Sequence, residues 1–290
     1  MKFVKMNGTG NDFILIDNLS GHLTGPSSKI HRLSSAQTSV RGEGGSRSWP
    51  DLARVWCHRR DGVGADGLIV LRSSSEGDFG WDFFNSDGSE AEMCGNGARC
   101  AIAYYLSLRA SPPERAVTLE TRAGLVRGWR TVRGIEVEMP KPSRCLPREV
   151  ELYDRSMEVW YVNTGVPHVV LLGPVEDEAE WTKKARVIRF HVTFAPDGAN
   201  VNQIQRLDSQ SVAITTYERG VEGITSACGT GAVAGALVAH LEYGTSSPVR
   251  MVNRGGDLWI HFRVSKKNPH DFDGVALEGS VEVTTEGFLY

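Results

Sequence analysis

The residues of this sequence best suited to chemistry are two cysteines that stand in the same short pattern. Segments Cys94–Ala98 and Cys228–Ala232 both read Cys-Gly-x-Gly-Ala, and their cysteines lie 134 residues apart. Each pattern is predicted to begin a helix, where unpaired backbone N–H groups and the helix dipole favour negative charge. A thiol there has its pKa lowered from about 8.5 toward neutrality, which makes it a competent base or nucleophile. The Gly-x-Gly that follows leaves bare N–H groups free to hold a carboxylate.

Two such cysteines, one in each half of the chain, point to a reaction that uses both. If the halves close on one ligand, a thiolate removes a proton from one face of a carbon and a thiol returns a proton to the other. That inverts a stereocentre beside a carboxylate, while the helix amides stabilise the charge of the transition state. The alternative is that Cys94 and Cys228 are small buried hydrophobic residues, as free cysteines often are. Cys57, Cys100 and Cys145 lack the glycine pattern and are interpreted in that way.

Other polar residues lie near the two cysteine patterns. His168 follows a rigid Gly-Val-Pro turn that can aim its ring at a pocket, although a core or surface histidine is the alternative. Glu218 and Arg219 end a predicted strand shortly before Cys228. They are suited to bind an ammonium and a carboxylate, or they form a solvated pair, as most such pairs do. Three asparagines near the same elements are, taken singly, typical turn formers: Asn85, Asn96 and Asn200.

One further motif resembles a dinucleotide-binding fingerprint but lies between the wrong elements. Segment Gly62–Gly67 spells G-x-G-x-x-G, but a dinucleotide-binding fingerprint needs a strand before it and a helix after it. Here a helix is predicted before the motif and the strand Leu68–Leu71 after it, so we reject a dinucleotide site. No spacing typical of metal ligands is present in the sequence. The two-thiol chemistry itself requires neither a metal nor pyridoxal phosphate.

The elements that must position these residues are many short strands with one long helix in each half, which predicts an α+β fold. Long helices are predicted at Gly95–Leu108 and about Thr230–Glu242, and a shorter amphipathic one around Leu52–Trp56. Because both cysteine patterns begin a long helix, we expect duplicated lobes that face one another. Strands are predicted at Lys2–Met6, Phe13–Ile16, Leu68–Leu71, Val117–Glu120, Leu125–Trp129, Gly134–Glu138, Val159–Val162, Val169–Leu172, Val187–His191, Val212–Tyr217, Val249–Val252, Asp257–Val264, Asp273–Glu278 and Ser280–Thr284.

The turn-rich segment Pro140–Pro147 is the predicted boundary between the lobes. It divides the chain into an N-terminal lobe at residues 1–142 and a C-terminal lobe at residues 143–290. Between residues 20 and 50, Ser, Gly, Thr and Arg dominate and the apolar periodicity is lost. That change predicts a loop insertion in the first lobe.

Composition excludes several classes of protein. Among 290 residues, 32 are Lys or Arg and 35 are Asp or Glu, so the basic surplus of a nucleic-acid-binding module is absent. The longest apolar stretch, Ala232–Leu241, is too short to span a bilayer. The first residues lack the apolar core of a signal peptide, and five sparse cysteines fit free thiols in a reducing compartment. We therefore expect a cytoplasmic protein, and the two-thiol chemistry makes a small-molecule substrate its expected partner.

Taken together, five stretches of the chain resemble the diaminopimelate epimerase family, whose members convert LL- to meso-diaminopimelate without pyridoxal phosphate. The stretches run in the family's order over nearly the whole chain, and their combination is far more specific than any one of them. They are Lys5–Phe13, Gly62–Gly67, Phe84–Cys100, Gly165–His168 and Tyr217–Gly231.

The resemblance implies a fold and a set of roles. It implies two similar lobes, each a mixed or antiparallel sheet wrapped round a central helix, with the active site in the cleft between them and a homodimer as the assembly. Cys94 and Cys228 would be the acid/base pair. The remaining roles follow in the same way: Gly95, Asn96, Gly229 and Thr230 would hold the reacting carboxylate, Asn11, His168 and Glu218 would lie near the reacting amino group, and Asn85, Asn200 and Arg219 would recognise the distal end of the substrate.

Two positions depart from the family pattern. Many members carry glutamine where Gly67 stands and asparagine where Val166 stands. Losing one neutral hydrogen bond costs about 0.5–1.5 kcal/mol, so binding of diaminopimelate would survive on the other contacts. The function expected is epimerisation of LL-diaminopimelate for lysine and peptidoglycan precursor synthesis. The alternatives are an epimerase or racemase of another amino acid and a non-catalytic amino-acid-binding protein.

Overall fold

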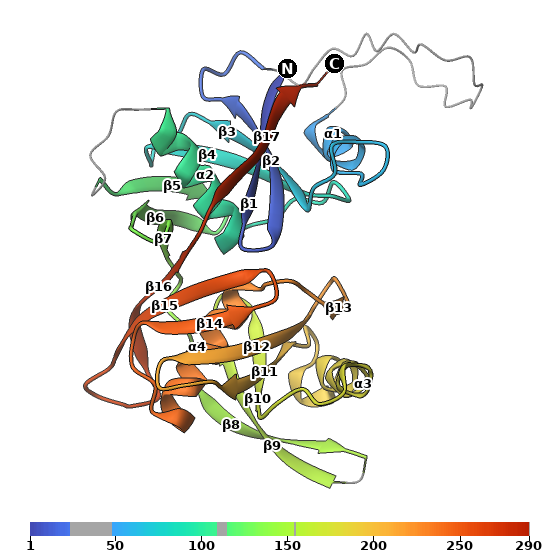
Figure 1. Cartoon of the computed structure of the whole chain (residues 1–290), viewed down its shortest axis with the longest axis vertical. Coiled ribbons are helices and arrows are strands. Elements are labelled where there is room, and N and C mark those ends of the chain that lie inside the picture. Colours follow the sequence, from blue (N-terminus) through green and yellow to red (C-terminus); the bar gives the residue numbers. More distant parts are fainter. Residues whose placement is uncertain (24–47, 109–114, 154, 290) are drawn as a thin grey trace, which may run out of the picture.

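The structure is a computed structural model that describes residues 1–23, 48–108, 115–153 and 155–289 (Figure 1). These residues form a mixed α+β fold, as the sequence predicts. The insertion predicted between residues 20 and 50 falls mainly on residues 24–47, which lie outside the described residues. Within the described ranges, none of the helices is long and apolar enough to cross a membrane.

Short strands and a few helices alternate along both halves of the chain. The first half contains β1 (Lys2–Gly8), β2 (Asn11–Asn18), α1 (Trp49–Trp56), β3 (Gly67–Arg72), β4 (Phe79–Asn85), α2 (Gly95–Ser107), β5 (Val117–Thr121), β6 (Gly124–Arg130) and β7 (Ile135–Glu138). The second half contains β8 (Leu146–Leu152), β9 (Arg155–Asn163), β10 (Pro167–Leu172), α3 (Glu178–Arg189), the 3-10 helix η1 (Val192–Phe194), β11 (Asn200–Arg206), β12 (Ser211–Glu218), β13 (Gly223–Ile224), α4 (Gly229–Tyr243), β14 (Val249–Asn253), β15 (Gly256–Val264), β16 (Phe272–Gly279) and β17 (Glu282–Phe288).

The two halves repeat one order of strand pairings. From β1 to β7, successive neighbours pair antiparallel, parallel, antiparallel, parallel, antiparallel and antiparallel. The strands β9, β10, β11, β12, β14, β15 and β16 pair in the same succession. Helices α1 and α3 follow the second strand of each series, and α2 and α4 follow the fourth. This correspondence supports the duplication expected from the two cysteine patterns.

The last strand of each series leads into a strand that belongs to the other half. After β7 the chain forms β8, which pairs antiparallel with β9, and after β16 it forms β17, which pairs antiparallel with β1. Figure 1 shows β17 in red, running along β1 in the upper lobe. Strands β7 and β16 pair with each other and join the two sheets. The lobe boundary at residues 142 and 143 stays a prediction, and β17 crosses it.

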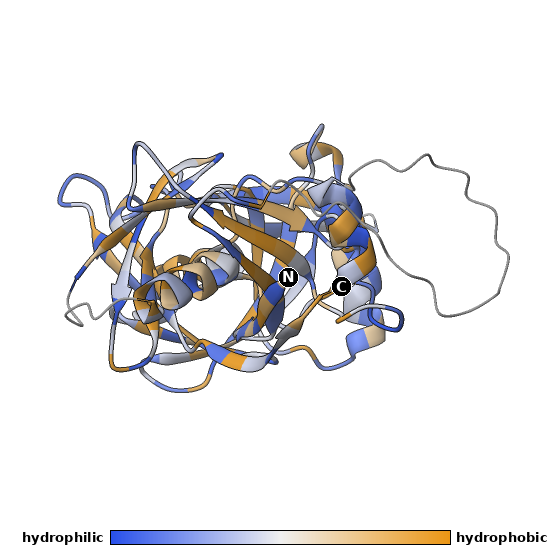
Figure 2. Cartoon of the chain, turned by 90° about the horizontal axis from the view of Figure 1, so that it is seen from above, coloured by the Kyte–Doolittle hydropathy of each residue, from blue (hydrophilic) through white to orange (hydrophobic). Residues whose placement is uncertain are grey.

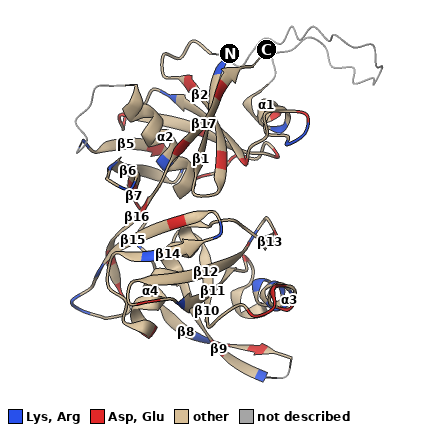
Figure 3. Cartoon of the chain, in the orientation of Figure 1, with Lys and Arg blue, Asp and Glu red and all other residues tan. Residues whose placement is uncertain are grey.

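Each sheet encloses one of the two long helices. Helix α2 packs against β1, β2, β3, β5, β6 and β7, and α4 against β9 to β12 and β14 to β16. Seen from above, a helix lies within a ring of strands (Figure 2). An enclosed helix is typically apolar on all sides, and α4 carries no charged side chain before Glu242. Helix α2 departs from this pattern at one residue, the buried Arg99. Charged residues of both signs gather instead on outer elements such as α3 (Figure 3).

The strand predicted at Val187–His191 is wrong, because these residues end helix α3 and lead out of it. Its buried residues Trp181, Ala185 and Ile188 follow helical spacing, and the Asp177 side chain caps its first amides. The sequence does not predict strands β4, β8 and β11 or the short β13. Strand β11 reads Asn-Val-Asn-Gln-Ile-Gln-Arg, a polar sequence that can be buried because its amide side chains find hydrogen-bond partners inside the protein.

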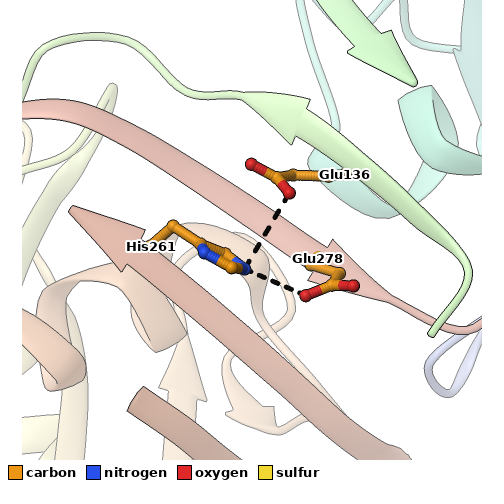
Figure 4. Close-up of side chains that lie close together, drawn as sticks. All are labelled: Glu136, His261 and Glu278. Atoms are coloured by element: carbon orange, nitrogen blue, oxygen red, sulfur yellow. Dashed lines mark hydrogen bonds and ion pairs between the residues drawn. The ribbon is translucent and has the colours of Figure 1, made fainter. Parts of the chain in front are cut away.

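A cluster of three titratable side chains spans the junction of the two sheets (Figure 4). His261 on β15 lies 2.9 Å from Glu278 on β16 and 3.9 Å from Glu136 on β7. Their ligand atoms lie within 4.8 Å of one another, a spacing that a metal ion could use. However, Arg133 and Thr131 donate to the same Glu278 carboxylate, at 3.1 and 2.6 Å. Because a guanidinium cation already neutralises this carboxylate, we interpret the cluster as a hydrogen-bond network that holds the sheets together.

We expect Glu278→Gln to lower the free energy of unfolding at pH 7 by about 2 kcal/mol, because Arg133 loses a buried charged acceptor. Burial alone would raise the pKa of Glu278, but hydrogen bonds from Thr131 and His261 and the charge of Arg133 outweigh it and lower the pKa. Stability from a lowered carboxyl pKa is present above the unfolded value, about 4.3, and is lost as the pH falls through the folded value.

Urea unfolding at neutral pH and at about pH 3 measures this effect. The difference between wild type and Glu278→Gln should shrink at the lower pH, because this pH lies below the unfolded pKa and the ionised carboxylate contributes less stability there. Glu138→Gln is the matched control, since Glu138 is a half-exposed partner of Arg127 on β7 and its loss should cost less than about 1 kcal/mol. A difference of the same size at both pH values would contradict an ionised Glu278.

Candidate active site

Both pattern cysteines cap the helices that the sequence predicts. Cys94 is the N-cap of α2, with φ −144° and ψ 119°, and its Sγ accepts a hydrogen bond from the Gly97 N–H at 3.4 Å. Cys228 is the N-cap of α4, with φ −126° and ψ 113°, and its Sγ lies 3.5 Å from Thr230 Oγ1. Each thiol therefore lies in the first turn of its helix, beside amides that have no intrahelical acceptor.

The two helix starts converge on one side chain. A Cβ built on Gly95 would lie 2.9 Å from Leu277 Cδ2, and one built on Gly229 would lie 3.1 Å from the same atom. The Gly229 position is also 3.6 Å from Asn96 Oδ1 in the opposite lobe. Leu277 lies on β16, the strand that pairs with β7 at the junction of the sheets. Glycine after each cysteine thus lets the two helices approach, and bulkier residues would separate them.

The expectation that the helix starts lower the pKa of the two thiols is wrong. Burial raises the pKa of Cys94 above its ordinary value and outweighs the hydrogen bonds from the Gly97 and Asn96 amides. Burial likewise raises the pKa of Cys228, and the Glu218 carboxylate raises it further. Both thiols are therefore protonated at neutral pH in this structure. The helix dipole favours the thiolates, but in these surroundings desolvation dominates.

The other three cysteines are buried, as the sequence interpretation expects. Cys57 is 2% exposed, and Cys100 and Cys145 are 0% exposed. Burial raises the pKa of each of them to about 12. Thiols with such pKa values are inert near neutrality, and these residues act as small hydrophobic side chains.

A cavity of about 770 Å³ lies between the halves of the chain, beside Cys94. Four other residues predicted for the site also line it: Asn11, Asn85, Glu218 and Arg219. The β1–β2 turn of the first lobe reaches the second lobe at the edge of this cavity. Gly10 there has φ +84°, and a Cβ on it would lie 2.8 Å from Gly255 Cα and 2.9 Å from Ser226 Cβ. The cavity is thus bounded by both lobes and closed at one edge by a contact that only glycine allows.

The remaining predicted residues, Cys228 among them, are not among the described residues that line this cavity. Asn200 Oδ1 accepts a hydrogen bond from the Arg219 N–H at 2.7 Å, so this side chain fixes the backbone of a cavity residue. Thr164 donates to the carbonyl oxygen of Thr230 at 3.0 Å and holds the start of α4. Asn96 is 2% exposed and donates to Asn11 at 2.6 Å. The direct contacts with a ligand expected of Asn96, Asn200 and Thr230 stay predictions.

His168 is fully buried and neutral. Burial, helped by the nearby charge of Arg219, lowers its pKa to about 3. Asn202 Nδ2 lies 3.1 Å from its Nδ1 and also donates to the Val169 carbonyl, so Nδ1 accepts and the ring proton lies on Nε2. Within the described residues, Nε2 has no hydrogen-bond partner. His168 is therefore suited to donate one hydrogen bond and unsuited to carry a positive charge.

Three charged residues that line the cavity were not predicted for the site: Arg59, Asp66 and Asp87. Asp66 accepts from the Asn11 side chain and from the Asp12 amide, both at 3.1 Å. Arg59 donates to both oxygens of Asp12, at 2.7 and 2.8 Å, and to Asp66 at 2.6 Å. Asp66 stands inside the glycine motif Gly62–Gly67, so the motif that fails as a dinucleotide site contributes to this cavity instead.

The structure explains one departure from the family pattern. A Cβ at Gly67 would lie 2.6 Å from the Phe83 ring and 2.8 Å from the Phe84 carbonyl oxygen. A side chain at this position therefore has no room while Phe83 keeps its place. Phe83 and Phe13 line the cavity and pack edge to face, with ring centroids 5.9 Å apart. This wall of the cavity is therefore apolar, whereas a glutamine at position 67 would make it polar.

Solved structures with low sequence identity share this fold over their whole length. A phenazine biosynthesis protein of the PhzF family from Bacillus anthracis superposes with a TM-score of 0.68 at 12% identity and covers 99% of this chain and 98% of that one. A probable proline racemase from Agrobacterium radiobacter K84 superposes with a TM-score of 0.66 at 15% identity, covering 100% and 92%. This chain and these two structures therefore share one fold.

Sequence comparison identifies the family of this chain. The model of the diaminopimelate epimerase family matches residues 3–145 and 160–282, and the chain belongs to this family. A diaminopimelate epimerase of Aquifex aeolicus (strain VF5) is 39% identical, covering 100% of this chain and 98% of the relative. One of Archaeoglobus fulgidus is 38% identical, covering 89% and 88%. The resemblance inferred from the five motifs is confirmed.

Proposed function

We propose that this protein epimerises LL-diaminopimelate to meso-diaminopimelate with Cys94 and Cys228 as its two bases. The observation that carries the proposal is the convergence of two helix starts, each preceded by a cysteine, on Leu277, with Cys94 lining the cavity. Membership of the diaminopimelate epimerase family supports the substrate. The same membership supports a homodimer in the cytoplasm as the working form.

In the proposed reaction the substrate carboxylate binds at the two helix starts. The Gly95–Asn96 and Gly229–Thr230 amides donate to its oxygens, where the helix dipoles favour negative charge. One thiolate then removes the α-proton and the opposite thiol returns a proton to the other face of the carbon. The same amides stabilise the charge that spreads into the carboxylate in the transition state. After one turnover the protonation states of Cys94 and Cys228 are exchanged, so the reverse reaction uses the same pair.

Proton NMR of LL-diaminopimelate in deuterium oxide with reduced enzyme tests the proposal. We expect loss of the α-proton signal together with the appearance of the meso isomer. A protein that binds the amino acid without catalysis would leave the signal intact. Absence of exchange with LL-diaminopimelate would therefore overturn the proposed substrate.

The apolar wall beside Gly67 favours one second candidate, which is the same two-thiol chemistry on another amino acid. Phe13 and Phe83 offer no hydrogen bond to a polar distal group, and position 67 has no room for one. A panel of amino acids followed by α-proton exchange separates the candidates. Faster exchange with an amino acid that has an apolar distal end would favour the second.

Arg219 provides a test of the distal carboxylate. Arg219 lines the cavity, and its backbone N–H donates a hydrogen bond to Asn200 Oδ1. We expect Arg219→Met to raise the KM for LL-diaminopimelate about 10- to 100-fold, because a hydrogen-bonded ion pair is lost, with a smaller effect on kcat.

L-Lysine is the matched ligand for this test, because it is diaminopimelate without the distal carboxylate. Its inhibition constant should be nearly the same in wild type and in Arg219→Met. Arg206→Met is the control variant, since Arg206 is exposed at the end of β11. An unchanged KM in Arg219→Met would indicate that another group binds the distal end.

A further inference from the structure

Arg99 is a buried cation in the helix that begins at Cys94. It is 0% exposed, and in the part of the chain that the structure describes no carboxylate forms an ion pair with it. Burial lowers its pKa to about 10, so the guanidinium remains charged at neutral pH. A buried charge without a counter-ion is costly and calls for an explanation in the structure around it.

The guanidinium is held by oxygen acceptors from three separate segments. Its Nη2 donates to Asn96 Oδ1 at 2.7 Å and to Thr9 Oγ1 at 3.1 Å. Its Nη1 donates to the Ser280 carbonyl at 2.9 Å. Thr9 belongs to the β1–β2 turn beside the cavity, and Ser280 to the passage from β16 to β17, where the chain returns to the first lobe. Arg99 thus joins α2 to both.

A chain of amide side chains runs from Arg99 to the cavity. Asn96 Nδ2 donates to Asn11 Oδ1 at 2.6 Å, and Asn11 Nδ2 donates to Asp66 Oδ2 at 3.1 Å. An arginine can only donate and an ionised carboxylate can only accept. The two ends therefore fix the direction of every hydrogen bond between them: Asn96 must turn its oxygen to Arg99, and Asn11 must turn its oxygen to Asn96.

We propose that Arg99 is a positioning residue of the epimerisation site, which orients the Asn96 and Asn11 amides and holds a positive charge behind the carboxylate-binding start of α2. The proposal rests on the proposed function. Asn11 lines the cavity, and the Asn96 side chain belongs to the residue whose backbone N–H would hold the carboxylate, so the orientation of both side chains bears on ligand binding. The charge of Arg99 also lowers the pKa of the Cys94 thiol, so the anions that it would stabilise are the Cys94 thiolate and a carboxylate bound at this helix start.

Arg99→Gln and Arg99→Lys test the two parts of the proposal. Glutamine removes the charge, and lysine keeps it but cannot donate in the fixed fork that reaches Asn96, Thr9 and Ser280 together. For each variant we would measure kcat and KM with LL-diaminopimelate. We would also measure the pH dependence of iodoacetamide labelling at Cys94 and at Cys228, resolved by peptide mass spectrometry.

In Arg99→Gln we expect kcat to fall about 10- to 100-fold through misplaced amides. Labelling of Cys94 should move to higher pH by about one unit, because a nearby cation is lost, while labelling of Cys228 stays in place. In Arg99→Lys the Cys94 profile should return to that of wild type although kcat stays low. Arg133→Met is the control, since Arg133 also ties the sheet junction through Glu278 and does not line the cavity. It should lose stability and keep kcat.

The outcomes separate this proposal from the proposed function. A wild-type kcat in Arg99→Lys would overturn the orienting role, and this variant keeps the test open if Arg99→Gln does not fold. Equal shifts of Cys94 and Cys228 in Arg99→Gln, or no shift, would overturn the role of the charge. The labelling profiles need no substrate, so they decide the charge even if wild type fails to exchange the α-proton of LL-diaminopimelate.

Discussion

Replacing Cys94 or Cys228 by alanine is expected to lower kcat for epimerisation by about 10²- to 10⁴-fold, the contribution of one positioned acid or base. Inversion needs a proton donor and a proton acceptor on opposite faces of one carbon, and each variant keeps only one of them. The two cysteines precede separate helices whose starts meet at Leu277, so neither thiol can take over the face that the other serves. Chiral chromatography of the product measures the loss.

A sharper result is expected from α-proton exchange in the single variants. The remaining thiol can still remove a proton from the one isomer whose hydrogen faces it. Cys94→Ala and Cys228→Ala should therefore exchange the α-proton of opposite isomers, each without inversion. Cys145→Ala is the matched control, because this buried cysteine lies outside the cavity and should keep kcat. Inversion at the wild-type rate in either single variant would end the two-base account.

The helix starts could be predicted from the sequence because a cap is a local pattern. A cysteine followed by Gly-x-Gly and then an apolar run indicates its own helix start, and both Cys94 and Cys228 are N-caps in the structure. The family motifs extended this local signal to Asn11, Asn85, Glu218 and Arg219, all of which line the cavity. Short patterns therefore located the cavity-lining half of the site.

The properties that depend on distant parts of the chain could not be predicted. The direction of the thiol pKa shifts comes from burial by both lobes, which outweighs the local helix dipole. The chain from Arg99 to Asp66 joins residues that are far apart in the sequence, such as Asn96 and Asn11. The pairing of β17 with β1 is equally non-local, because almost the whole sequence separates these two strands.

Glu218 is the residue through which the substrate can change the acidity of both thiols. Burial raises the pKa of Glu218 itself. Its negative charge in turn raises the pKa of Cys94 and of Cys228. An α-ammonium group paired with Glu218 would cancel this charge, so binding of the substrate would lower the thiol pKa values. The empty site would then keep neutral thiols and form a thiolate only when the amino acid is present.

Glu218→Gln should separate the two effects of this carboxylate. We expect kcat/KM for LL-diaminopimelate to fall about 10- to 100-fold, because the ammonium loses a charged partner. Labelling of Cys94 by iodoacetamide in the absence of substrate should instead become faster at a given pH, since a nearby negative charge is removed. The control is Glu222→Gln, a neighbouring carboxylate that pairs with Arg189. If Glu218→Gln slowed the labelling of Cys94, or left kcat/KM unchanged, Glu218 would not be the group that couples binding to thiol acidity.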